Sequence, residues 1–265
     1  MPELPEVEAW RKLAETHAVG KKISAIHAAD DPLIYRISSP AEVASAMRHR
    51  KIVAAHRRGK YLWLELDRRP WPLLHFGMGG SLLTHSAREP HPRWWKLVLH
   101  FDDGSALTMR NIRRIGRVFL VDDPRTEPPV CRLGPDPLHE LATPSQLAER
   151  LRGRAGLIKP LLLRQDLFAG VGNWIADEVL YQAGISPHRT ADSLSKNELR
   201  RLHGRLGSVI RRAVEVDADS ERFPRSWLFH HRWGKTKGAV TGRGEAIRFD
   251  TIAGRTAAWV PTRQR

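Results

Sequence analysis

The stretch "KYLWLEL" at residues 60–66 is a short apolar run of the length and composition that β-strands have. Similar runs follow, separated by Pro, Gly and Asp-Asp-Gly turns, at 72–78 ("PLLHFGM"), 95–101 ("WKLVLHF") and 116–121 ("GRVFLV"). Strands with this spacing predict a mostly antiparallel β domain from about Ile23 to Leu120. A helix at 39–47 ("SPAEVASAM") is expected to be inserted among them.

One amphipathic helix is expected ahead of this β domain. Pro5 suits the first turn of a helix, apolar residues then recur at helical spacing as far as His17, and Gly20 is placed to end the segment.

The second half of the chain reads as helical. A proline-rich stretch at 122–144 suppresses regular structure and suggests a hinge. Helices are expected at 145–151 and 172–184, and a third begins at the S-x-x-E capping box of Ser195 and Glu198. The basic, aromatic-rich tail predicts a small hairpin. The sequence therefore predicts an α+β protein with a β domain at 1–125, a hinge at 126–144, a helical domain at 145–221 and a hairpin region at 222–265.

Composition narrows the partners. The 265 residues hold 44 Lys and Arg against 29 Asp and Glu, a net charge of +15 that attracts polyanions, nucleic acid above all. A general adaptation of the surface is the alternative. The single cysteine, Cys131, excludes an internal disulfide and a zinc site built from several cysteines. No apolar run is long enough to span a membrane and the start is unlike a signal peptide, so a cytoplasmic, nucleoid-associated protein is expected.

The first ten residues, "MPELPEVEAW", raise a chemical possibility. If Met1 is removed, as the small following residue permits, Pro2 becomes a free secondary amine close to Glu3 and Glu6. An N-terminal amine titrates near 7.7 to 8.0 in peptides, so a useful fraction is unprotonated at neutral pH. Such an amine can form an iminium with a sugar carbon, and two carboxylates can manage the proton transfers. The alternative is a plain helix start, because Pro and Glu are favoured there.

The chain resembles the formamidopyrimidine-DNA glycosylase and endonuclease VIII family, whose members excise oxidised bases and then cut the strand. The matching segments are "MPELPEVE" (1–8), "GKYLWLEL" (59–66), "HFGMGGSL" (75–82), "NIRRIG" (111–116), "GVGNWIADEVL" (170–180) and "AGRTAAWVP" (253–261). The resemblance implies an N-terminal catalytic β-sandwich, a helix-two-turn-helix domain and a β-hairpin finger.

The resemblance also implies catalytic residues. The processed N-terminal proline of the family is the nucleophile, which corresponds to Pro2, and the adjoining glutamate corresponds to Glu3. Glu6 matches a further acidic position, and Lys60 matches a lysine near the phosphate and sugar of the lesion.

Contacts with DNA follow from the same resemblance. His75, Asn173 and Arg255 match phosphate-binding positions, although an isolated His75 would more often be a satisfied structural histidine. Met78, Arg113 and Ile115 match the three side chains that fill the gap left by an extruded base. Met78 alone reads equally well as a core methionine. Ile115 departs from the phenylalanine of better-known members, which removes aromatic stacking but keeps an apolar wedge.

The finger departs from the family more strongly, because the four zinc-binding cysteines of many members are missing. His230 and His231 lack partner ligands at a convincing spacing, so a zincless finger without metal is expected. Apolar packing by Trp227, Trp233 and Trp259 is expected to stabilise it.

The function expected from these features is base excision repair. The protein would be a bifunctional DNA glycosylase and abasic-site lyase, acting as a monomer on double-stranded DNA with an oxidised base or abasic site through a Pro2 Schiff base and β,δ-elimination. No cofactor or membrane is expected. Oxidised purines and oxidised pyrimidines stay open as substrates. Alternatives are a non-catalytic protein that binds damaged or abasic DNA and, more remotely, an RNA-associated protein.

Overall fold

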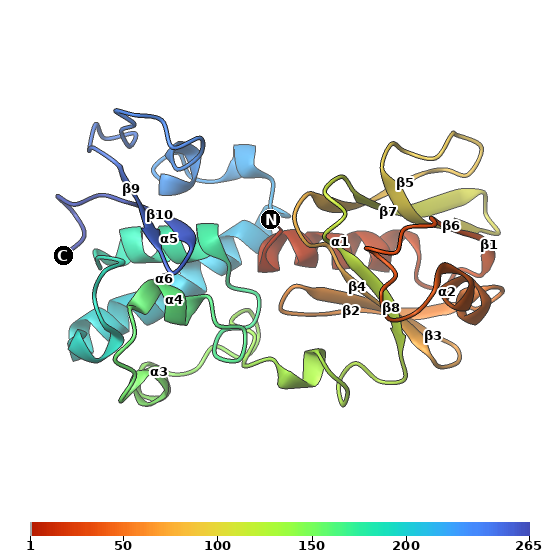
Figure 1. Ribbon diagram of the computed structural model, residues 1–265, viewed down its shortest axis with the longest axis horizontal. Coiled ribbons are helices and arrows are strands. Elements are labelled where there is room, and N and C mark those ends of the chain that lie inside the picture. Colours follow the sequence, from red (N-terminus) through yellow and green to blue (C-terminus); the bar gives the residue numbers. More distant parts are fainter. Residues whose placement is uncertain (1) are drawn as a thin grey trace. The chain divides into compact units, whose positions relative to one another are not determined.

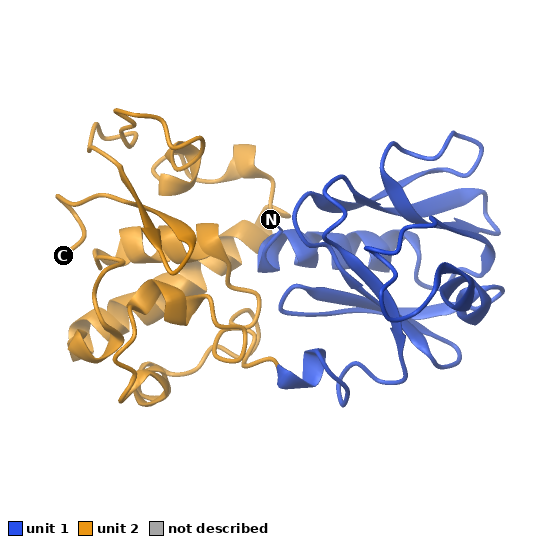
Figure 2. Cartoon of the chain, in the orientation of Figure 1, with its two compact units in different colours: residues 1–132 blue, residues 133–265 orange. Residues whose placement is uncertain are grey.

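The computed structural model describes residues 2–265 and divides the chain into two compact units, residues 1–132 and 133–265 (Figure 2). The border lies inside the segment 126–144, which the sequence predicts to be a hinge. The α-helices are α1 (Leu4–His17), α2 (Pro40–Met47), α3 (Pro144–Leu151), α4 (Ile158–Leu162), α5 (Asn173–Ala183) and α6 (Lys196–Glu215). The strands are β1 (Ile23–Ala28), β2 (Ile52–Arg58), β3 (Tyr61–Leu66), β4 (Trp71–His75), β5 (Gly80–Ser86), β6 (Trp95–Phe101), β7 (Ser105–Asn111), β8 (Arg117–Val121), β9 (Arg248–Ile252) and β10 (Arg255–Trp259).

The first unit contains two four-stranded antiparallel sheets, with strand orders β1-β6-β7-β5 and β2-β3-β4-β8 (Figure 1). Leu64 and Leu74 of the second sheet line the same small internal space as Leu97 and Leu107 of the first. The apolar faces of the two sheets therefore meet in one core, which confirms the antiparallel β domain predicted from the strand pattern.

Helix α1 packs against β2, β3 and β5. It covers the predicted range and carries Pro5 in its first turn. A buried ion pair joins it to β2, because Glu8 Oε2 accepts a hydrogen bond of 2.7 Å from Arg57 Nε. Trp10 packs on Phe76 with ring centroids 4.3 Å apart. The start of the chain is thus fixed to the sandwich at two points.

The second unit is helical, as predicted. Helix α6 begins at the Ser195–Glu198 capping box and buries one apolar face, which includes Leu202, Leu206 and Ile210. It packs against α3 and α5, and α5 ends at Gly184 in the left-handed conformation with φ 68°. No helix within residues 2–265 is long and apolar enough to cross a membrane.

A two-stranded hairpin follows near the end of the chain, where β9 and β10 pair in antiparallel register. Ala253 and Gly254 form its turn, both with positive φ (46° and 73°). This pairing confirms the hairpin predicted from the tail, and β10 packs against α5.

Candidate active site

The N-terminus of α1 gathers three of the predicted site residues. Pro2 is half-buried and precedes Glu3, which caps the helix and is only 2% exposed. Glu6 Oε2 accepts a hydrogen bond of 3.0 Å from the Glu3 backbone N–H, one of the two bonds of a capping box. The residues therefore start a helix, and Glu3 and Glu6 both lie within four residues of Pro2 in the sequence.

Lys60 lies in the tight turn between β2 and β3. The buried Arg57 that binds Glu8 also donates through Nη1 to the carbonyl of Gly59 at 3.1 Å. Lys60 follows directly and is 8% exposed. The Glu8–Arg57 pair thus connects the helix that follows Pro2 with the turn that contains Lys60.

His75 ends β4, where it pairs with Tyr61 of β3 and lies against its ring at 4.8 Å. Burial, together with the positive charges of Lys60 and Arg117, lowers the pKa of His75 to about 4. The Gly77 N–H donates to His75 Nδ1 at 3.3 Å. The ring is therefore neutral at pH 7 and carries its proton on Nε2, which makes it a hydrogen-bond donor rather than a charge.

Two loops bring the predicted wedge residues together. Met78 lies between β4 and β5, and Arg113 lies between β7 and β8, yet Arg113 Nη1 approaches Met78 Sδ to 3.5 Å. Met78 is only half-buried, so it is not the core methionine that its apolar context also allows. Ile115 shares the second loop and is 39% exposed. All three side chains are at the surface of one unit.

Asn111 was not predicted, although it opens the motif "NIRRIG", and it holds these two loops together. Its fully buried amide donates from Nδ2 to the Phe76 carbonyl at 2.6 Å and accepts at Oδ1 from the Ile115 N–H at 3.0 Å. Gly77 has φ 55°, and a Cβ there would lie 2.5 Å from the Ile115 carbonyl. The two backbones touch, which leaves room only for glycine.

Replacing Asn111 by Ala should therefore loosen the wedge and destabilise the first unit. The change leaves buried Phe76 and Ile115 backbone groups without partners, a cost of about 2–4 kcal/mol in the free energy of unfolding. Urea denaturation measures it. The exposed Asn197 of α6 is a matched control, and Asn197→Ala should change the free energy by less than about 0.5 kcal/mol. Equal stability of the two variants would contradict the proposal that the Asn111 hydrogen bonds hold the two loops together.

The base of the same loop is held by a charge cluster. Arg114 donates to both carboxylate oxygens of Asp31, at 2.9 and 3.0 Å, and Lys96 Nζ lies 2.8 Å from Asp31. Burial opposes ionisation of Asp31, but the hydrogen bonds from Arg114 and Lys96 outweigh it and lower its pKa to about 2. The loop that carries Arg113 and Ile115 is thus restrained on both sides.

In the second unit, Asn173 is the first residue of α5, after the cap residue Gly172. Its Oδ1 is buried and makes no hydrogen bond within residues 2–265. Gln165, which sequence reasoning missed, shapes the preceding loop. It donates to the Val171 carbonyl at 2.9 Å and accepts from the Gly170 N–H at 3.0 Å. A helix N-terminus held open in this way suits an anion.

Arg255 starts β10 directly after the hairpin turn, and its side chain is exposed. Its strand is bonded to α5 through Asp177, whose Oδ2 accepts from the Ala258 N–H at 3.1 Å. Lys159 and Arg232 flank that carboxylate at 2.6 and 2.7 Å, and all three side chains are almost fully buried. Asn173 and Arg255 therefore belong to one rigidly joined pair of elements.

This buried charge network was not predicted. The sequence favoured packing by three tryptophans, and each of them makes contacts. Trp227 is buried beside Trp174, and Trp259 Nε1 donates to Asp250 at 2.6 Å. Trp233 is 50% exposed and lies edge-on to Phe229, with ring centroids 5.2 Å apart.

Glu178, next to Asp177 on α5, gives the second unit a pH-dependent stability. Burial raises its pKa to about 7, against the hydrogen bonds from Gln182 and the Phe229 N–H. Between about pH 4.5 and 7 the folded state keeps a proton that the unfolded state loses, so stability falls as pH rises, by about 3 kcal/mol in all.

Urea denaturation of Glu178→Gln and the parent chain at pH 4.5 and 8 measures this effect. Between pH 4.5 and pH 8 the free energy of unfolding should fall more for the parent than for the variant, because a glutamine side chain does not titrate. A difference between the two that is independent of pH would contradict the assignment.

The comparisons with known proteins agree with this geometry. Residues 1–118 match the formamidopyrimidine-DNA glycosylase N-terminal domain, and residues 133–225 match the formamidopyrimidine-DNA glycosylase H2TH domain. The formamidopyrimidine-DNA glycosylase of Arabidopsis thaliana is 43% identical over all of this chain and 71% of its own length. That of Geobacillus kaustophilus is 35% identical over the full length of both.

Solved structures give the same result. The Lactococcus lactis formamidopyrimidine-DNA glycosylase, non-covalently bound to DNA with an abasic site, superposes with a TM-score of 0.87 at 27% identity over 99% of both chains. MutM in complex with DNA containing carbocyclic 8-oxo-G gives 0.87 at 29% identity over the full length of both. The chain therefore belongs to the formamidopyrimidine-DNA glycosylase family of DNA-repair glycosylases.

Proposed function

We propose that this protein excises oxidised bases from double-stranded DNA and then cleaves the strand as an abasic-site lyase, with the Pro2 nitrogen as its nucleophile. The observation that carries the proposal is the turn in which half-buried Pro2 and buried Glu3 precede a helix tied by Glu8 and Arg57 to the Lys60 turn. A reacting amine needs such fixed neighbours.

The proposed reaction begins when the Pro2 lone pair attacks C1′ of the damaged nucleoside. The bond to the base breaks, and the base leaves with the electron pair and takes up the proton that the Pro2 nitrogen releases. Glu3 donates a proton to the ring oxygen as the sugar opens, giving an iminium between Pro2 and C1′.

The iminium draws electrons from C2′, so a C2′ proton is lost and the 3′ phosphate is expelled. A second elimination, with loss of a C4′ proton, expels the 5′ phosphate. Water then hydrolyses the iminium and releases the sugar fragment from Pro2. Glu6 assists these proton transfers, and the Lys60 ammonium stabilises the departing phosphate charge.

DNA would be held by donors of different kinds. His75 offers a neutral Nε2–H, Asn173 offers its amide and the helix N-terminus, and exposed Arg255 offers a charged fork. Met78, Arg113 and Ile115 would fill the gap left by the extruded base. With a net charge of +15, much of the affinity should come from phosphates and should weaken as salt rises.

Oxidised purines are the lesions we propose first, because the matched MutM structure contains DNA with carbocyclic 8-oxo-G. A matched abasic-site complex supports abasic DNA as the second substrate. We propose that a monomer carries out the whole reaction, since all assigned residues come from one chain.

Product analysis on duplexes with one defined lesion each tests the proposal. We expect base release and strand cleavage at 8-oxoguanine and at an abasic site, ending in phosphate on both sides of the gap. The rival function, damage binding without chemistry, predicts lesion-selective binding and intact strands. Cleavage confined to oxidised pyrimidines would agree with the proposed mechanism but overturn the assignment of oxidised purines as substrates.

A further inference from the structure

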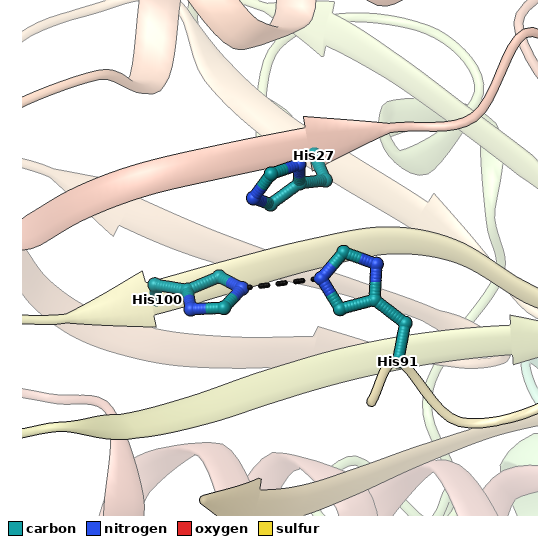
Figure 3. A group of neighbouring side chains, drawn as sticks. All are labelled: His27, His91 and His100. Atoms are coloured by element: carbon teal, nitrogen blue, oxygen red, sulfur yellow. Dashed lines mark hydrogen bonds between the residues drawn. The ribbon is translucent and has the colours of Figure 1, made fainter. Parts of the chain in front are cut away.

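Three histidines converge on the outside of the first sheet (Figure 3). His27 comes from β1, His100 from β6 and His91 from the loop between β5 and β6. In the antiparallel pairing of β1 with β6, His100 lies opposite Ala25. His27 is two residues beyond Ala25, so both imidazoles project from the same face.

The spacing of the ring nitrogens fits a metal ion. His91 Nε2 and His100 Nε2 lie 3.4 Å apart and share a hydrogen bond, which a bound ion would replace (Figure 3). One nitrogen from each of the three rings lies within 4.8 Å of the others. A tetrahedral ion with metal-to-nitrogen bonds of about 2.0–2.1 Å separates its ligand nitrogens by about 3.4 Å. Two of the rings already have this separation, and the His27 nitrogen, within 4.8 Å of both, would have to move closer.

A fourth histidine, His85, is a neighbour but is not a ligand. Its Nε2 lies 2.8 Å from Thr108 Oγ1 and its Nδ1 2.9 Å from the Ser86 carbonyl, so both nitrogens are occupied.

Part of the cluster is already ordered. His91 packs edge-on against Trp95 at 4.9 Å, and His27 contacts the rings of His91 and His100 at 4.7 and 5.1 Å. Two of the three ligands are on hydrogen-bonded strands, so binding an ion would cost little conformational entropy of the backbone. His27 is exposed and the other two are half-buried, which leaves access for an ion from solvent.

We propose that His27, His91 and His100 bind one divalent ion of the zinc class, with the fourth position open to water. Three imidazoles suit Zn²⁺, Co²⁺, Ni²⁺ and Cu²⁺, whereas Mg²⁺ and Ca²⁺ prefer oxygen ligands. This site is unrelated to the finger, where the sequence predicts no metal.

Titration of the full chain, stripped of metal, with Co²⁺ tests the proposal. We expect intense visible absorption typical of four-coordinate Co²⁺, saturating at one ion per chain and displaced by Zn²⁺. Saturating Zn²⁺ at a hundredfold excess over Kd should raise Tm by about 5–10 °C.

His91→Asn and His100→Ala should each weaken binding by at least about 100-fold and abolish the rise in Tm. His91 is in a loop, so its variant keeps the sheet intact if His100→Ala unfolds. The exposed His17 of α1 is the control, and His17→Ala should bind as the parent does. Failure of the parent to bind Co²⁺, or binding that survives in the His91→Asn protein, would overturn the site.

Discussion

Strand cleavage should fall by at least about 10⁴-fold when a Gly-Ser extension keeps the Pro2 nitrogen in a peptide bond. An amide nitrogen shares its lone pair with the carbonyl and cannot attack a sugar carbon. Single-turnover cleavage of a duplex with an abasic site measures the loss. Binding of a non-cleavable abasic analogue should stay within about threefold of the parent, because the proposed phosphate-binding residues His75, Asn173 and Arg255 are unchanged.

The control is the same protein after a protease has removed the extension and exposed Pro2. Its cleavage rate should return to that of the parent, which separates a blocked nucleophile from a damaged fold. Cleavage by the extended chain at an undiminished rate would remove Pro2 from the mechanism.

Glu3→Gln should give the second largest effect, a loss of about 10²–10⁴-fold in base excision. Glu3 is 2% exposed beside Pro2, and the amide keeps its size but carries no acidic proton to give to the opening sugar. Single-turnover release of 8-oxoguanine measures the loss. Tm should remain within about 3 °C of the parent because the exchange preserves volume.

Glu6→Gln is the matched control for this change. Glu6 serves as a hydrogen-bond acceptor for the Glu3 N–H, and an amide oxygen can do the same, so we expect a loss of only about tenfold. Equal losses in the two variants would contradict the proposal that Glu3 is the principal proton donor.

Much of the fold could be predicted because its signals are local. The starts of α1, α2 and α6 follow from prolines and capping boxes within four residues, and the strands follow from short apolar runs. Local signals also predict the β9–β10 hairpin, whose turn needs positive φ at Ala253 and Gly254. These features depend on neighbours along the chain rather than on the packed structure.

The supports of the site could not be predicted in this way. Asn111 clamps a carbonyl 35 residues earlier in the sequence, and Asp177 joins Lys159, Arg232 and the backbone of Ala258. Such contacts arise only when distant segments pack together. The neutral state of His75 likewise depends on burial and on the nearby charges of Lys60 and Arg117.

The residue assignments in the active site came from the resemblance, since an isolated Lys60 or His75 carries no signal of its own. The three histidines of the proposed metal site could not be predicted from the sequence either. Their positions, 27, 91 and 100, have no motif spacing, and only the register of β1 with β6 and the path of the β5–β6 loop bring them together.

Borohydride trapping tests the central claim, a covalent bond between Pro2 and deoxyribose, most directly. The native protein is mixed with an abasic-site duplex, reduced, digested and analysed by mass spectrometry. We predict a stable protein–DNA adduct whose sugar remnant lies on the N-terminal peptide, on the nitrogen of Pro2 with Met1 absent. Efficient strand cleavage without any adduct, or an adduct on a lysine such as Lys60, would contradict the account.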